Sequence, residues 1–202
     1  IEGTRVPGVD VLSDREIRSR NPFPQKKLNA LYREMRENGI ARSATGEITH
    51  DLRRGTLLIV SPKAEVFCLE KGALKGNRVS VAGTETPQTI AFFSMDGKRI
   101  AESRDLLIIH LTNSLNRNTR FDSPSMREQQ PGTSYRQQLI RTAAPEVNLT
   151  LDGPVADLKI TALASDGREL GPVRFTARGS SFHFILNNAL YPEGILYYRI
   201  QR

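Results

Sequence analysis

The chain has 202 residues, a single cysteine, no tryptophan and a net charge of +7 at pH 7. This length suffices for one large domain with its own hydrophobic core, and one cysteine excludes the disulfide-rich class because no intrachain disulfide can form. The net charges of residues 1–54, 55–142 and 143–202 are +3, +4 and 0, whereas groove binding requires a concentrated basic stripe. Composition therefore predicts no nucleic-acid partner. It also predicts no membrane partner, since no apolar run is long enough to span a bilayer.

The first 44 residues are predicted to form a loop and one helix. Residues 1–23 show no sustained periodicity, and their abrupt start, without the features of a signal peptide, indicates a fragment of a longer protein. The next apolar side chains recur at helical spacing: Leu28, Leu31, Tyr32 and Met35. Pro24 suits the first turn of this helix and Gly39 its C-terminal cap. Because a single amphipathic helix cannot bury its own stripe, we expect it to cover a sheet edge or face.

From residue 45 the sequence becomes a series of short apolar segments separated by turn residues. The central pair is predicted at residues 89–95 and 106–111, joined through Asp96-Gly97, whose glycine supplies the positive φ of a tight reversal. Asp166-Gly167 repeats this hairpin chemistry. Both central segments are apolar on both phases, which predicts strands shielded on both faces, with the helix as a candidate cover. The other predicted strands are residues 55–60, 66–69, 78–82, 136–142, 147–151, 157–164, 173–177, 182–186 and 196–200.

This pattern predicts an all-β fold, a two-layer antiparallel β-sandwich with one N-terminal amphipathic helix. An up-and-down barrel is the structural alternative. The predicted division is an N-terminal loop and helix over residues 1–44 and a β-sandwich domain over residues 45–202. Residues 113–131 are predicted to form a long polar connection, which in a compact domain is typical of a loop that is either functional or poorly ordered.

No catalytic or metal site is predicted. The chain has no Gly-x-Ser-x-Gly motif. His50, His110 and His183 fall in different predicted elements; His50 beside Asp51 is the only local metal candidate, and His110 is expected to be a hydrogen-bonded core or edge histidine. Glu47 and Asp51 are expected to cap turns rather than to act as acid and base. We therefore predict that the chain is not an enzyme and that it needs no cofactor and no metal.

Two tyrosines are candidate glycan contacts. Tyr135 and Tyr191 fall in predicted loops, where an exposed ring can stack on the apolar face of a pyranose. Such a role would make the chain a sugar-binding protein without catalytic residues.

Six segments carry a resemblance to a known family. They are Asn38–Ile48, Leu58–Lys63, Phe93–Ser103, Leu106–Thr112, Asn118-Thr119 and Leu196–Ile200. In this order and spacing they resemble the C-terminal β-sandwich domain that follows the catalytic β/α barrel in large bacterial glycoside-hydrolase-like proteins. The likeness covers residues 38–202.

In that family the barrel carries the catalytic glutamates and the sandwich is an accessory layer. The resemblance therefore implies a non-catalytic accessory domain that stabilises the barrel and borders its glycan cleft, with residues 1–44 as a remnant of the barrel domain. It implies the catalytic barrel of the same polypeptide and polysaccharide as partners, and a secreted or periplasmic location. It also adds Asn118 to the candidate glycan contacts. An independent carbohydrate-binding module and a basic nucleic-acid-binding protein remain as alternatives.

Overall fold

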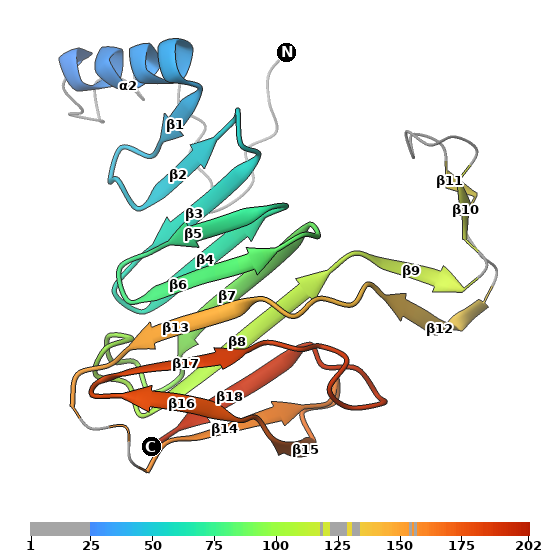
Figure 1. Ribbon diagram of the computed structural model, residues 1–202. Coiled ribbons are helices and arrows are strands. Elements are labelled where there is room, and N and C mark those ends of the chain that lie inside the picture. Colours follow the sequence, from blue (N-terminus) through green and yellow to red (C-terminus); the bar gives the residue numbers. More distant parts are fainter. Residues whose placement is uncertain (1–24, 118, 122–128, 131–133, 154, 156) are drawn as a thin grey trace, which may run out of the picture.

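The computed structural model describes residues 25–117, 119–121, 129–130, 134–153, 155 and 157–202. Within these residues the chain forms a nine-stranded and a five-stranded antiparallel sheet, which pack face to face, and one helix (Figure 1). The predicted two-layer β-sandwich with one N-terminal helix is confirmed.

The larger sheet has the strand order β1-β2-β3-β4-β7-β8-β18-β14-β15. β7 (Gln88–Ser94) and β8 (Asp105–Thr112) lie side by side near its centre, as predicted. The other strands are β1 (Ile40–Arg42), β2 (Ile48–Asp51), β3 (Thr56–Val60), β4 (Ala64–Leu69), β14 (Lys159–Leu163), β15 (Glu169–Pro172) and β18 (Tyr197–Gln201). Because β1 belongs to this sheet, the sheet begins within the predicted N-terminal segment 1–44.

The smaller sheet has the strand order β16-β17-β13-β6-β5. Its strands are β5 (Gly72–Lys75), β6 (Val79–Thr84), β13 (Glu146–Thr150), β16 (Phe175–Arg178) and β17 (Ser181–Ile185). Alternate side chains of both sheets point between the layers and make the core, in which Phe67 and Phe92 contact edge to face with ring centroids 6.2 Å apart. The sheet order is open at both ends, so the sandwich and not the barrel alternative is observed.

The helix α2 (Gln25–Asn38) confirms the predicted helix. Gly39 follows it with a φ of 72°, and its N–H donates to the Met35 carbonyl oxygen at 3.0 Å. Figure 1 places α2 beside the edge strand β1, but the helix does not bury its apolar stripe there, although the sequence had led us to expect this. It does not cover β7 or β8, and the helix is therefore not the cover of the central strands. Tyr32 keeps 54% and Met35 37% of its surface exposed.

The connection between β7 and β8 spans residues 95–104, so the predicted tight reversal at Asp96-Gly97 is wrong. The Asp96 carboxylate organises this longer loop. Its Oδ1 accepts hydrogen bonds from the Ser94 and Ser103 hydroxyls, each at 2.9 Å, and its Oδ2 accepts one from the Arg104 N–H at 2.9 Å. The Arg104 N–H is the main reason why the pKa of Asp96 lies below its ordinary value. The second Asp-Gly pair does form the predicted tight hairpin, between β14 and β15.

We expect Asp96→Ala to lower the melting temperature clearly more than Asp166→Ala. The Asp96 carboxylate accepts bonds from three residues spread over its loop and from the Lys98 N–H, whereas Asp166 accepts one bond, from the Arg168 N–H. Because the pKa of Asp96 is lowered by folding, its contribution is present above about pH 4 and is lost as the pH falls further. Thermal unfolding of both variants at neutral pH checks this prediction. Equal melting temperatures would contradict it.

Beyond β8 the chain leaves the sandwich as a separate hairpin arm (Figure 1). In it β9 (Ser114–Arg117) pairs with β12 (Ser134–Ile140), and β10 (Arg120–Phe121) pairs with β11 (Gln129–Gln130). The long polar connection predicted over residues 113–131 contains short strands that the sequence did not signal, because pairing across the arm overrides their polar sequence. Tyr135 lies on β12 and not in the predicted loop. Asn118 lies outside the described residues.

Candidate functional site

The residues examined for catalysis do not converge. His50 and Asp51 are neighbours on β2 and point to opposite faces of the sheet, since successive side chains of a strand alternate. The Asp51 carboxylate accepts bonds from the Arg53 and Arg54 N–H groups, so it caps a turn, as predicted. His110 is fully buried in the core. Among the described residues, no three His, Cys, Asp or Glu side chains are grouped to hold a metal ion.

One pocket of about 400 Å³ brings two carboxyl groups to its walls, those of Glu47 and Glu65. Burial raises the pKa of Glu65, a property that general acids also show. However, Glu65 is 1% exposed, and its oxygens accept hydrogen bonds from the main-chain N–H groups of Arg78 (2.8 Å) and Val79 (3.2 Å). Both oxygens are therefore occupied by the β5–β6 turn, and we interpret Glu65 as a structural group.

The most distinctive surface is the outer face of the larger sheet, on the side away from the smaller sheet. Strand register places one apolar side chain from each of seven neighbouring strands in a single row. The row is Ile48, Ile59, Val66, Ala91, Ile109, Tyr197 and Leu163. The flanking rows add Leu57, Cys68, Leu111, Phe93 and Leu107. We call these twelve residues the outer apolar face.

The outer apolar face is unevenly exposed. Ile48 and Leu111 keep 41% and 42% of their surface exposed, and Ile59, Val66 and Ile109 are half-buried, whereas Ala91 and Leu163 are buried. The exposed apolar side chains therefore lie mainly towards the β2 end of the row and beside it, and grouped exposed apolar side chains on a soluble protein often mark an interaction site.

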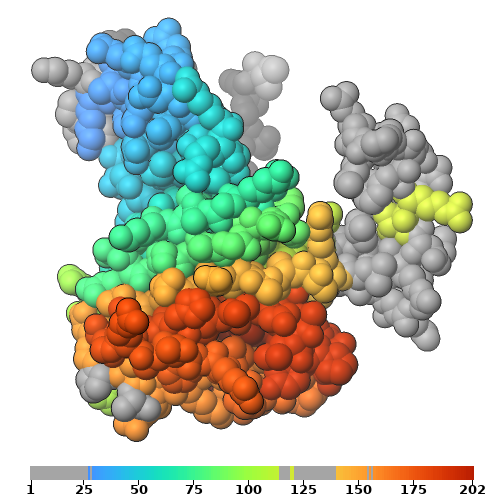
Figure 2. Space-filling model, viewed as in Figure 1, coloured from blue at the N-terminus to red at the C-terminus, as the bar shows by residue number. Residues whose placement is uncertain are grey.

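The outer face of the smaller sheet has the opposite character. The corresponding row across its five strands is Lys75, Ser80, Asn148, His183 and Thr176, all polar. Figure 2 views the molecule from the side of this sheet, so the outer apolar face is on the far side. The outer face of the smaller sheet is thus mainly polar, as contact with water predicts for an antiparallel sheet, although Ile185 on β17 is an exposed apolar side chain there.

A strong ion pair borders the outer apolar face. Arg199 on β18 donates from Nε and Nη2 to the two carboxylate oxygens of Asp105 on β8, at 2.8 and 2.7 Å. The hydrogen bonds from Arg199 hold the pKa of Asp105 below its ordinary value. The charges of Arg199 and Asp105 are therefore paired with each other at the margin of the outer apolar face.

Comparisons with known proteins leave the family open. No protein-family model, no curated protein and no solved structure matches this chain. Among the described residues, no helix has the length and apolar character needed to cross a membrane. The resemblance to a glycoside-hydrolase accessory domain thus stays a prediction.

The predicted glycan contacts stay predictions. Tyr191 lies in the loop between β17 and β18, as predicted, and its hydroxyl donates to the Pro172 carbonyl oxygen at 3.2 Å. Tyr135 lies on the hairpin arm, and Asn118 is not described. The outer apolar face was signalled in the sequence by the two segments that are apolar on both phases. The sequence could not show which of these phases faces away from the smaller sheet.

Proposed function

We propose that this chain is a non-catalytic accessory β-sandwich domain of a carbohydrate-active enzyme. In this proposal the outer apolar face docks against the catalytic β/α barrel of the same polypeptide and stabilises it. The carbohydrate class rests on the six segments that resemble glycoside-hydrolase accessory domains. A secreted or periplasmic location, and a full-length protein that is a glycoside hydrolase, follow from the same resemblance.

The observation that carries the docking role is the contrast between the two outer faces. A row of seven apolar residues on the larger sheet lies opposite a row of five polar residues on the smaller one. Covering apolar surface contributes about 25 cal/mol per Å², so side chains such as Ile48 and Leu111 favour an assembly in which this face is buried. The exposed Tyr32 and Met35 on α2 are a second apolar surface without a cover among the described residues.

The docking role is tested with the chain and the barrel segment of the full-length polypeptide produced as separate proteins. We expect the two to elute together from a sizing column and the barrel to melt at a higher temperature in the complex, because the chain binds only the folded barrel. Ile109→Lys, in the middle of the apolar row, is expected to abolish co-elution. Thr176→Lys adds the same charge to the polar row and is expected to leave it unchanged.

Each variant is checked for folding by circular dichroism before mixing. Equal binding by the two lysine variants would contradict docking through this face. The absence of catalysis is checked separately, by incubating the chain alone with a panel of glycosides. Turnover that is lost on mutation of a residue in this chain would contradict a purely accessory role.

A further inference from the structure

A second surface, on the side of the sandwich away from the outer apolar face, has the features of a ligand site. It is a groove of about 740 Å³ at the corner where the chain passes from β15 to β16. Its walls come from residues 172–176, from residues 183–185 on β17, and from the following loop at Asn187, Leu190 and Tyr191. This volume is within the range of about 300–1,000 Å³ that small-molecule sites occupy.

The groove contains an aromatic platform that is held in place. The hydroxyl of Tyr191 donates to the Pro172 carbonyl oxygen, and its ring packs so closely over Gly171 that a Cβ at that position would overlap the hydroxyl and the ring. Phe175 lies in the same groove and is itself fixed edge to face against Phe182, with ring centroids 5.8 Å apart. A fixed ring loses little conformational entropy when a flat apolar surface stacks on it.

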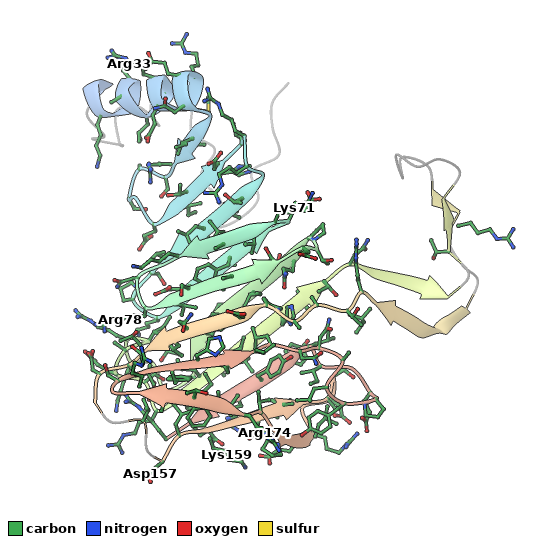
Figure 3. All side chains as sticks on the ribbon, in the orientation of Figure 1. Arg33, Lys71, Arg78, Asp157, Lys159 and Arg174 are labelled. Atoms are coloured by element: carbon green, nitrogen blue, oxygen red, sulfur yellow. The ribbon has the colours of Figure 1, made fainter. Side chains whose placement is uncertain are left out.

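The charge of the groove is one-sided. Its lining residues include Arg174 and His183 and no carboxylate. Figure 3 labels Arg174 beside β15 and β16, and its guanidinium group makes no ion pair or hydrogen bond with the described residues. One carboxylate interacts with a lining residue from outside the groove: an oxygen of Glu146 lies 3.5 Å from His183 Nε2. An exposed guanidinium without a partner is well suited to bind a carboxylate through two parallel hydrogen bonds.

We propose that this groove binds an acidic saccharide, with a uronate carboxylate on Arg174 and the apolar face of a sugar ring on Tyr191. We infer a saccharide because an aromatic ring can stack on the apolar face of a sugar. We infer that the saccharide is acidic because the guanidinium of Arg174 has no partner among the described residues and can bind a carboxylate. The Asn187 amide, which also lines the groove, adds a group that can bond to sugar hydroxyls. The site is separate from the outer apolar face, so it is independent of docking to a barrel.

The proposal is tested by isothermal titration calorimetry of the full chain with tetragalacturonic acid, and with cellotetraose as the neutral probe. We expect saturable binding of the acidic probe, weakened when the salt concentration rises, and at least about tenfold weaker binding of cellotetraose. Arg174→Ala should weaken binding of the acidic probe about tenfold or more. Arg178→Ala, which removes the same charge from β16 outside the groove, should leave the dissociation constant within about twofold.

Tyr191→Leu is the second variant and is expected to weaken binding about threefold to tenfold while Arg174 is intact. Because Tyr191 also packs against the core, its melting temperature is measured first. Equal losses in the Arg174 and Arg178 variants would overturn the proposal, because binding would then reflect overall charge. Binding of cellotetraose or of inorganic phosphate at the same midpoint would overturn it as well, as would no saturable binding of tetragalacturonic acid. Failure of barrel docking leaves all these outcomes unchanged.

Discussion

The free energy of unfolding is expected to fall by about 2–3 kcal/mol between about pH 7.5 and pH 4.5 through one residue, His110. His110 is fully buried, and its Nε2 lies 2.8 Å from Gln88 Oε1. Its Nδ1 has no partner, so the neutral ring is accommodated but a second N–H would remain unbonded. Burial lowers the pKa of His110 from 6.5 to about 4.

The sign follows from where protons bind. Between pH 6.5 and about 4 the unfolded chain takes up a proton on His110 and the folded chain does not, so stability is lost as the pH falls through this window. His110→Phe should be less stable at neutral pH, because Gln88 Oε1 loses its hydrogen bond to the histidine ring. The variant should also lack the loss of stability between pH 6.5 and about 4 that His110 causes. Urea unfolding at several pH values measures the slope. His50→Phe is the control, because His50 is exposed on β2; the same slope in wild type and His110→Phe would contradict the prediction.

Apolar alternation located the buried strands well. The predicted segment 106–111 is β8, and the predicted segment 182–186 differs from β17 by one residue at each end. Within the two sheets of the sandwich, the strands that were missed are short and lie at or near sheet edges: β1, β2, β5 and β15. Edge strands bury fewer side chains, so they need little apolar patterning. β15 even contains Gly171 and Pro172, which are tolerated there because an edge strand needs only one set of ladder bonds.

The two Asp-Gly pairs show why local sequence was insufficient for the turns. Asp166 bonds only within its own hairpin, to the Arg168 N–H, whereas Asp96 also bonds to Ser103 and Arg104, up to eight residues away. The partners of Asp96 become available only when β8 pairs with β7. Similarly, His110 was expected to be a hydrogen-bonded core or edge histidine; it is buried, and its ring has one partner, Gln88, which the sequence could not name.

The candidate surfaces were predictable only in part. The central strands were recognised as apolar on both phases, yet which phase faces the smaller sheet depends on connections made elsewhere in the chain. Tyr191 was placed in a loop, as observed. Its groove was not predictable, because Arg174, between β15 and β16, and His183, on β17, come together only after the smaller sheet forms.

Replacing Glu65 with leucine is expected to lower the free energy of unfolding by about 3 kcal/mol or more, because the buried N–H groups of Arg78 and Val79 both lose their acceptor. Glu65→Gln keeps one acceptor oxygen and should lower it by about 1–2 kcal/mol. Gly76→Ala should act in the same direction, since a Cβ at Gly76 would overlap the Glu65 carboxylate. Glu47→Gln, at the exposed wall of the same pocket, should change it by less than about 0.5 kcal/mol.

The pH dependence of Glu65 is opposite in sign to that of His110. Burial raises the pKa of Glu65 above 4.5, so the folded protein binds a proton on Glu65 more tightly than the unfolded chain does. The contribution of this protonation to the free energy of unfolding is lost as the pH rises through the pKa of the folded state. Chemical unfolding of Glu65→Gln and Glu47→Gln at neutral pH, together with a glycosidase assay of both, separates a structural from a catalytic carboxyl group. A structural Glu65 predicts lost stability and no turnover in any variant. Turnover in the wild type that disappears in Glu65→Gln at unchanged stability would instead make Glu65 a general acid and would contradict the accessory role.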